Sequence, residues 1–405
     1  MTGRLVIVGA GQAGFALAAK LRGLGDSRPI TIVGAEENLP YQRPPLTKKY
    51  LLGEMTFDRL LFRPEHWYAD NNVEIRVSTW VEQIDRAAKQ IVMQDGSRLD
   101  YETLALATGS TPRRLPPAVG GALEGVYLAR DKRDADLLAG EMRPGRRVLI
   151  IGGGYIGLEA AAVARHRGLE VTLIEMGDRI LQRVAAKETA DIFRAIHQKH
   201  DVVIREKIGL KQLIGRNGHV AAAELSDGST IDVDFVVVGI GVAPNDRLAK
   251  EAGLEVGNGI VVDSFARTSD PSIFAMGDCV ELPWEGGRIR LESVQNAVDQ
   301  AEAAAGIIAG NEKAYDPKPW FWSDQYDVKL QIAGFNLGYD ETLLRPGMRE
   351  GAASIWYFKQ GRFIAVDAIN DAKAYVTGKK LLETGANPSR DILADPAADL
   401  KQLLV

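Results

Sequence analysis

The chain of 405 residues contains a single cysteine, Cys279, so no intramolecular disulfide can form, either as a cross-link or as a redox pair. No stretch approaches 18 uninterrupted apolar residues, the length that would favour a membrane-spanning helix. The net charge is -5, without the excess of Lys and Arg that neutralises nucleic-acid phosphates. The N-terminus runs directly into an apolar run without a basic and apolar leader. We therefore expect a cytoplasmic protein with no nucleic-acid partner, no membrane partner and no metal site.

Two glycine fingerprints lie in the chain, GAGQAG (Gly9 to Gly14) and GGGYIG (Gly152 to Gly157). Each follows an apolar run, LVIV or VLII, and precedes an Ala-rich helical stretch and a second apolar run, ITIV or VTLI. In such a βαβ unit the first glycine makes the turn, the second admits a pyrophosphate and the third lets the helix pack on the strand. Glycine-rich turns without a ligand would give the same letters, but the doubled context predicts two bound dinucleotides.

The fingerprints start 143 residues apart, which indicates a domain-sized repeat. Each is followed by a predicted meander, with one turn at Asp95 and Gly96 and the other at Asp227 and Gly228. Beyond Trp320 the pattern changes to a hairpin, IWYF-KQGR-FIAV, and a helix-like AKAYVTGKKLLET. The predicted fold is α/β, with two Rossmann-type nucleotide-binding domains and a C-terminal α+β domain. The predicted bounds are 1–112 with 235–312 for the first domain, 113–234 for the second and 313–405 for the third.

The acid after the second fingerprint predicts which nucleotide binds there. Glu175 ends the run VTLI, 23 residues past Gly152, where a carboxylate accepts both adenosine ribose hydroxyls and repels a 2′-phosphate. NADH is therefore favoured over NADPH, although an acid that only ends a strand would look the same. The first unit has Gly34 at this position, followed by Glu36 and Glu37.

Residues far along the chain favour FAD in the first unit. Asp278 follows an apolar run and a glycine, and an Ala-rich helix is expected to begin near Glu292. The N-terminus of such a helix offers free amides and partial positive charge to a reduced, anionic flavin. Periodicity alone also allows an ordinary Ala-rich core helix.

At these residues the chain resembles the FAD-dependent pyridine-nucleotide reductases, which have a glutathione-reductase-like fold. More narrowly, it is similar to the NADH-dependent ferredoxin reductases that serve bacterial haem monooxygenases and ring-hydroxylating dioxygenases. The segments that carry this narrower resemblance are YQRPPLTKKYLLGE, LALATGS, LARD, GGGYIGLEAAA, FAMGDC, ESVQNA and PWFWSDQY.

The resemblance implies the residues of both cofactor sites. Lys48 and Glu159 are the expected catalytic pair, because an ammonium near flavin N5 would stabilise the negative charge arriving with hydride and a carboxylate could hold it in place. Without its motif, Lys48 would read as a surface lysine beside Lys49. The residues implied for FAD are Gly9, Gly11, Ala13, Gly14, Arg43, Pro45, Lys48, Val81, Arg130, Asp278, Val294 and Trp320. Those implied for NADH are Gly152, Gly154, Tyr155, Ile156, Gly157, Glu159 and Glu175.

The scarcity of thiols separates this chain from the disulfide reductases and from the peroxidases or oxidases that use one cysteine near the flavin. The region TKKYLLGEM has no cysteine, and Cys279 is expected to be a small buried residue. Electrons must then leave the flavin directly, and a flavin can pass them singly to a [2Fe–2S] ferredoxin. Two alternatives stay open: an NADH:quinone reductase, and a flavoprotein with a binding or signalling role similar to apoptosis-inducing factor.

Overall fold

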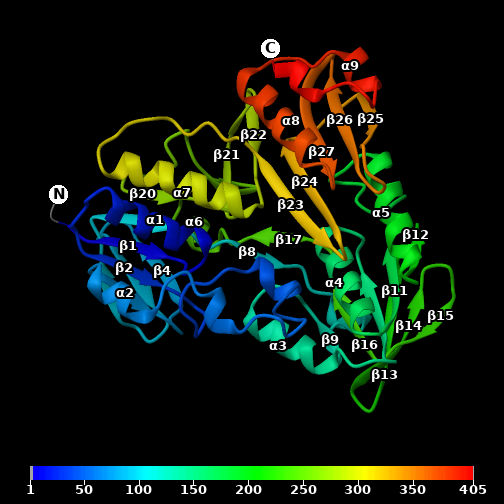
Figure 1. The fold of residues 1–405 in the computed structure, drawn as a ribbon. Coiled ribbons are helices and arrows are strands. Elements are labelled where there is room, and N and C mark those ends of the chain that lie inside the picture. The colour runs from blue at the N-terminus through cyan, green and yellow to red at the C-terminus, as the bar shows by residue number, and fades with distance from the viewer. Residues whose placement is uncertain (1–2, 405) are drawn as a thin grey trace. The chain divides into compact units, whose positions relative to one another are not determined.

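The computed structural model describes residues 3–404 (Figure 1). Its backbone contacts divide the chain into two compact units. Unit 1 consists of residues up to 42 together with 57–111 and 242–319, and unit 2 of 43–56, 112–241 and 320–404. The chain leaves unit 1 within β8 (Ser110–Pro112) and returns at β17 (Val242–Pro244). The predicted assignment to three domains stays a prediction, and each unit is described by itself.

Unit 1 is built on a parallel sheet of order β20-β7-β1-β2-β3. The runs LVIV and ITIV form two of its three inner strands, and every residue of both is buried, as is typical of a parallel sheet covered on both faces. Helix α1 (Gln12–Gly23) lies beside α7 (Val294–Ile308), and both are rich in buried alanine, which permits close packing (Figure 1). The strands are β1 (Leu5–Val8), β2 (Ile30–Val33), β3 (Val73–Arg76), β7 (Thr103–Leu106) and β20 (Ile273–Ala275).

An antiparallel meander and a small mixed sheet complete unit 1. The predicted meander is confirmed as β4 (Val81–Asp85), β5 (Gln90–Met93) and β6 (Arg98–Asp100), which turns at Asp95 and Gly96 before the chain enters the parallel sheet as β7. A second sheet has the order β18-β19-β21-β22. The remaining elements are β18 (Val256–Gly257), β19 (Gly259–Val261), β21 (Val280–Trp284), β22 (Gly287–Ile289), α2 (Glu65–Asp70), α6 (Arg247–Glu251) and η2 (Phe57–Leu60).

Unit 2 repeats the design with a parallel sheet of order β12-β11-β10-β16-β9. A three-stranded sheet, β13-β14-β15, holds the second predicted meander, whose turn lies at Asp227 and Gly228. The strands are β9 (Val126–Tyr127), β10 (Arg147–Ile151), β11 (Glu170–Glu175), β12 (Val203–Glu206), β13 (Leu210–Arg216), β14 (His219–Leu225), β15 (Thr230–Asp232) and β16 (Phe235–Val238). The helices are η1 (Pro44–Thr47), η3 (Pro117–Val119), α3 (Lys132–Glu141), α4 (Tyr155–His166) and α5 (Lys187–Lys199).

The C-terminal part of unit 2 is an antiparallel sheet of order β23-β24-β27-β26-β25, packed against α8 (Ala372–Thr384). The predicted hairpin is confirmed, since β26 and β27 pair across the KQGR turn, and α8 coincides with the predicted helical segment. The strands are β23 (Trp320–Gln325), β24 (Val328–Gly334), β25 (Glu341–Pro346), β26 (Ala353–Lys359) and β27 (Arg362–Ile369), followed by α9 (Arg390–Ala394) and η4 (Leu400–Leu404) after α8.

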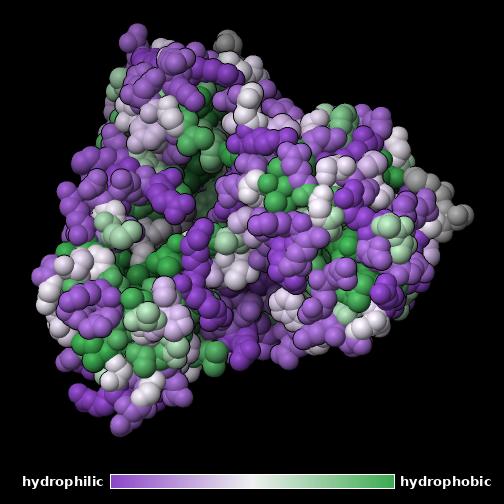
Figure 2. Space-filling model, turned by 180° about the vertical axis from the view of Figure 1, so that it is seen from behind, coloured by the Kyte–Doolittle hydropathy of each residue, from purple (hydrophilic) through white to green (hydrophobic). Residues whose placement is uncertain are grey.

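Hydrophilic and hydrophobic side chains are interspersed on the face that Figure 2 shows. Exposed apolar side chains occur within both units, such as Trp80 in unit 1 and Met348 in unit 2. Among residues 3–404, no helix is both long and apolar enough to cross a membrane.

A buried carboxylate joins the C-terminal sheet to α5. Asp367 of β27 is inaccessible to solvent, and its Oδ2 accepts hydrogen bonds from the hydroxyls of Thr189 (2.6 Å) and Tyr357. Its Oδ1 has no hydrogen-bond partner among the described residues. Desolvation therefore dominates and raises the pKa of Asp367 to about 6, against the lowering effect of the two hydroxyls.

This raised pKa makes stability depend on pH. Protonated Asp367 contributes about 3 kcal/mol to the free energy of unfolding. This contribution is fully present below the unfolded pKa of 3.8 and is lost as the pH rises through the folded pKa of about 6. The native chain should lose about 1 kcal/mol of unfolding free energy between pH 5 and pH 8 as Asp367 ionises, whereas Asp367→Asn should not show this loss. Guanidinium unfolding at both pH values measures this difference. The exposed Asp327→Asn is the control, and equal pH dependence of Asp367→Asn and the native chain would contradict the prediction.

Candidate functional site

The glycine loop of unit 1 has the geometry of a phosphate cradle. A methyl group on Gly9, whose φ is +119°, would lie 2.1 Å from the Ala107 carbonyl oxygen, and one on Gly14 would lie 2.0 Å from the carbonyl oxygen of Gly9. Both positions therefore exclude a side chain. At Gly11, by contrast, no described atom lies within 4 Å of such a methyl group. The open space stands at the second glycine, where the fingerprint places the pyrophosphate.

The glycine loop of unit 2 repeats this pattern. Methyl groups on Gly152 and Gly157 would lie 2.3 Å and 2.0 Å from the carbonyl oxygens of Gly239 and Gly152, whereas Gly154 faces open space. Helices α1 and α4 begin after Gly11 and Gly154, and neither residue supplies a side-chain cap. Each helix start can therefore offer backbone amides and a positive dipole end to a phosphate. Both loops fit a dinucleotide.

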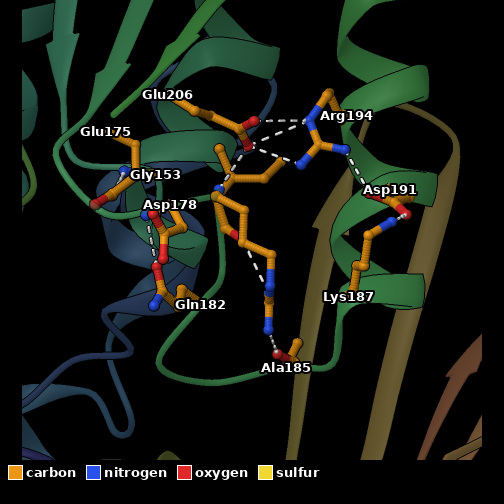
Figure 3. A network of polar contacts seen from close by, with 11 residues as sticks. Gly153, Glu175, Asp178, Gln182, Ala185, Lys187, Asp191, Arg194 and Glu206 are labelled. Atoms are coloured by element: carbon orange, nitrogen blue, oxygen red, sulfur yellow. Dashed lines mark hydrogen bonds and ion pairs between the residues drawn. The ribbon is translucent and has the colours of Figure 1, made fainter. Parts of the chain in front are cut away.

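Glu175 stands at the end of β11, beside the second glycine loop. Its Oε2 accepts a hydrogen bond from the amide of Gly153 at 2.7 Å (Figure 3). Its Oε1 accepts one from the amide of Gly177, also at 2.7 Å. The two amides fix the carboxylate at the loop where a dinucleotide would lie. Each oxygen keeps further acceptor capacity, so the carboxylate can also accept ribose hydroxyls.

Two arginines on the neighbouring segments already have partners. Arg194 of α5 pairs with Glu206 at the end of β12, at 2.8 Å, and with Asp191 (Figure 3). Arg179 donates to the carbonyl oxygen of Ala185 at 2.7 Å. Glu206 also accepts the amide of Ile180, which holds the loop after β11. A 2′-phosphate here would meet the carboxylate of Glu175 and two guanidinium groups engaged elsewhere.

In unit 1 the equivalent acid is absent for a steric reason. A Cβ on Gly34 would lie 2.5 Å from the Cβ of Ala10, so this position has no room for a carboxylate side chain. Glu36, two residues later, accepts a hydrogen bond from the hydroxyl of Tyr41 at 2.5 Å. The departure from the pattern seen in the sequence therefore follows from the packing of Ala10 against the strand end.

The Gly-Asp segment predicted to contact FAD lies beside α1. A methyl group on Gly277 would lie 3.2 Å from the Cβ of Ala13, and the next residue, Asp278, accepts a hydrogen bond from Ser110 at 3.0 Å. Helix α7 begins at Val294, as expected, but the hydroxyl of Ser293 caps one of its first amides. The expectation of free amides at this helix start is therefore wrong for the amide of Asn296, because the Ser293 side chain already accepts its hydrogen bond. Val81 is buried at the start of β4.

Lys48 and Glu159 form a pair inside unit 2. The Nζ of Lys48, at the end of η1, lies 3.1 Å from Oε1 of Glu159 on α4 and 3.8 Å from Oδ2 of Asp324. Glu159 is only 4% exposed, and burial raises the pKa of its carboxyl, while the Lys48 charge opposes that shift. Lys49 is exposed, so the two adjacent lysines differ in environment.

Two hydroxyls that the sequence reading missed also bind Glu159. Ser323 of β23 donates to its Oε1 at 2.7 Å, and Thr47 of η1 donates to its Oε2 at 3.2 Å. Both hydroxyls lower the pKa of the carboxyl. The signal for Ser323 was the alternation in PWFWSDQY, which places residues 321, 323 and 325 on one face of a strand. No sequence signal marked Thr47 beyond its place next to Lys48.

The other predicted residues of unit 2 lie on the same elements. Pro45 belongs to η1, and Arg43 just before it donates to the carbonyl oxygen of Arg130 at 3.2 Å. At the start of α4, Ile156 is 45% exposed, whereas the ring of Tyr155 packs 5.0 Å from that of Phe321. A nucleotide at this helix start would therefore meet the side chain of Ile156.

The aromatic segment behaves as alternation predicts. Trp320 and Trp322 share one face of β23, with ring centroids 5.6 Å apart. The Nζ of Lys379 on α8 lies 5.8 Å from the centroid of Trp320, and the Nζ of Lys48 lies 5.9 Å from that of Trp322. Each indole thus has a cation near its ring face.

Cys279 has the environment of an inert thiol. It is fully buried, and the carbonyl oxygens of Met276 (3.3 Å) and Leu106 (3.7 Å) both lie within hydrogen-bond distance of its Sγ, which has one proton to donate. Burial raises the pKa of the thiol, so the nucleophilic thiolate is disfavoured.

The contrast between open and blocked glycines can be tested in the second loop. We expect Gly154→Ala to fold normally but to lose about tenfold in kcat/KM for NADH, because the new methyl group fills the space for the pyrophosphate. Gly157→Ala should instead lower the melting temperature, because its methyl group meets a backbone oxygen at 2.0 Å. Thermal unfolding and NADH kinetics on both variants measure this. An unchanged kcat/KM in a folded Gly154→Ala variant would contradict the assignment.

Comparison with known proteins finds matches along nearly the whole chain. The model of the pyridine nucleotide-disulphide oxidoreductase family matches residues 3–301, and that of the reductase C-terminal domain matches residues 320–404. A ferredoxin–NAD(P)(+) reductase of Sphingomonas sp. is 41% identical, covering 99% of this chain and 97% of its own length. Rhodocoxin reductase of Rhodococcus erythropolis is also 41% identical, covering 98% and 93%.

Solved structures of similar reductases match the fold of this chain. The covalent putidaredoxin reductase–putidaredoxin complex matches with a TM-score of 0.96 at 35% identity, covering 99% of this chain and 98% of that one. The ferredoxin reductase for the CYP199A2 system of Rhodopseudomonas palustris matches with a TM-score of 0.95 at 38% identity, covering 99% and 100%. The predicted fold class is thereby confirmed.

Proteins of the matching family use FAD and a pyridine nucleotide, so both cofactor predictions are confirmed at that level. The chain belongs to the pyridine nucleotide-disulphide oxidoreductase family and carries its reductase C-terminal domain.

Proposed function

We propose that this protein is an NADH-dependent ferredoxin reductase, which passes electrons from NADH through FAD to a [2Fe–2S] ferredoxin that serves an oxygenase. The observation that carries the proposal is a pair of open dinucleotide cradles in a chain whose one thiol is buried and hydrogen-bonded. Without a redox thiol, electrons from the flavin go to an outside acceptor. The relatives named as ferredoxin, rhodocoxin and putidaredoxin reductases support this class of acceptor.

The residues of the chain divide the work as follows. Gly9, Gly11 and Gly14 with the start of α1 hold the pyrophosphate of FAD, and Ala13, Val81, Asp278 and Val294 complete its contacts within unit 1. Gly152, Gly154 and Gly157 with the start of α4 hold that of NADH. The chemistry that FAD would supply when held there is acceptance of hydride from NADH and release of electrons one at a time.

Glu159 holds the ammonium of Lys48 at 3.1 Å, and that positive charge stabilises the negative charge that arrives with hydride. Glu175 accepts the ribose hydroxyls and repels a 2′-phosphate, which gives the preference for NADH. We further propose that the protein works in the cytoplasm, where its hydride donor is available.

The cofactor preference gives one prediction. Glu175→Ala should raise KM for NADH and narrow the preference over NADPH, because lost charge-assisted hydrogen bonds cost about 1.5–3 kcal/mol, on the order of ten- to a hundredfold in kcat/KM. Steady-state kinetics with both nucleotides measure the ratio. Glu170→Ala, at the exposed start of the same strand, is the matched control. A ratio unchanged in Glu175→Ala would show that this carboxylate is not the ribose acceptor.

The transfer of electrons to ferredoxin gives a second prediction. Trp320 and Lys379 lie together on unit 2, and an acidic ferredoxin would be attracted by such a lysine. We expect Trp320→Ala to lower the ferredoxin-linked rate several-fold while leaving the reduction of ferricyanide, a small acceptor, largely intact. Added salt should slow only the ferredoxin reaction.

Measuring both acceptors at low and high ionic strength separates the explanations. Equal losses with both acceptors would show that Trp320 supports the flavin or the fold instead. A native rate that no ferredoxin stimulates would reject the reductase proposal and favour a binding or signalling flavoprotein.

A further inference from the structure

A line of hydrogen bonds continues from Glu159 away from Lys48. Ser323 donates to Oε1 of Glu159 at 2.7 Å, and the Nε2 amide of Gln325 donates to the hydroxyl oxygen of Ser323 at 3.1 Å. The Oε1 of Gln325 lies 2.7 Å from Nε2 of His197, and Nδ1 of His197 lies 3.2 Å from the hydroxyl of Tyr326. Three consecutive hydrogen bonds thus join the buried carboxylate on α4 to a histidine on α5, and a fourth extends the line to Tyr326.

One arrangement of protons satisfies every member of this line. Ser323 has one proton, which goes to the carboxylate, so its oxygen accepts from the amide nitrogen of Gln325. The amide oxygen of Gln325 then requires a donor, so His197 carries its proton on Nε2 and accepts at Nδ1 from Tyr326. Every donor in the line therefore points toward Glu159.

The line is shielded from water. Ser323 and His197 are inaccessible, Gln325 is 1% exposed and Glu159 is 4% exposed. In such a low-dielectric setting, hydrogen bonds in series polarise one another, and here the polarisation favours negative charge on Glu159. Burial lowers the pKa of His197 to about 4, so its ring stays neutral near neutral pH and keeps the single proton that the arrangement requires.

The line follows from the alternation of β23 and its place in unit 2. Phe321, Ser323 and Gln325 fall on one face of the strand, where Phe321 packs against Tyr155 of α4. Tyr326 follows at a φ of +55°, and its ring stacks on that of His200, with centroids 3.7 Å apart. A strand of the C-terminal sheet thereby connects two helices of the nucleotide-binding fold.

We infer that Ser323, Gln325 and His197 are positioning residues for Glu159, which hold its carboxylate ionised and directed at the ammonium of Lys48. The inference deepens the proposed function, on which the role of Lys48 rests. The titratable and charged groups around the pair are Lys48 itself and Asp324, and those around the far end are His200 and Arg165. A protonated Glu159 would lose its charge attraction for Lys48, and the ammonium would no longer have a fixed place.

The test measures the titration of Glu159 in the FAD-loaded protein without NADH. Carboxyl carbons of glutamate are labelled with ¹³C, and the Glu159 signal is assigned by its loss in Glu159→Gln. We expect Ser323→Ala to weaken acid dissociation of Glu159 about tenfold, the equivalent of one charge-assisted hydrogen bond. Ser323→Thr, which keeps the hydroxyl, should restore the native titration. Ser354→Ala, which removes another buried hydroxyl of the same sheet, should leave it unchanged.

Tyr326→Phe keeps the ring that stacks on His200 and removes the last donor, so it should weaken dissociation in the same direction by a smaller factor. It also tests the line should Ser323→Ala fail to fold. A Glu159 titration that is native in the folded variants of Ser323 and Tyr326 would overturn the inference.

The pH profile of hydride transfer, followed as flavin bleaching in stopped flow, separates this inference from the proposed function. If the titration and the acid limb of the rate shift together in Ser323→Ala, both are supported. If the titration shifts while the rate profile stays native, the line positions Glu159 as inferred, and the role proposed for Lys48 and Glu159 in hydride transfer is rejected.

Discussion

The burial of an ionised carboxylate organises unit 2. Glu159 sits one helical turn inside α4, where desolvation opposes its charge and only hydrogen-bond donors or a cation can compensate. Those partners come from separate parts of the chain: Thr47 and Lys48 from the 43–56 segment, and Ser323 from the C-terminal sheet. The segments that supply them belong to the same compact unit, and displacing either would leave a charge buried with less compensation.

The two glycine loops share the same close packing of helix on strand, but the residue at the end of the following strand differs between them. In both, a helix approaches its strand so closely that a methyl group on the third glycine would meet a carbonyl oxygen at 2.0 Å, while the second glycine faces open space. The loops differ at the end of the following strand, where unit 1 has Gly34 packed on Ala10 and unit 2 has Glu175. Selectivity is thus added by one side chain without altering the cradle.

The sequence predicts well whatever depends on local pattern. The fingerprints with their flanking strands, the turns at Asp95 and Asp227 and the C-terminal hairpin and helix all follow from spacing and periodicity. It predicts poorly the residues that act through long-range pairing. Ser323 lies 164 residues from Glu159, and only the packing of β23 against α4 brings the two together. The cap of α7 by Ser293 was also missed. A serine at this position competes with a ligand for the first amides of the helix.

The two buried acids of unit 2, Asp367 and Glu159, differ in the groups that bind them. Glu159 belongs to a line of hydrogen bonds whose other members are uncharged. Asp367 has one oxygen without a partner, and its pKa rises to about 6, so its charge changes within the physiological range of pH. Glu159 is joined to His197 through the amide of Gln325, which passes on polarisation but does not carry a proton as an acid or an imidazole would. With His197 held neutral by burial, no member of the line can deliver a proton to Glu159. The charge that fixes Lys48 is therefore insulated from the titration of its own supports.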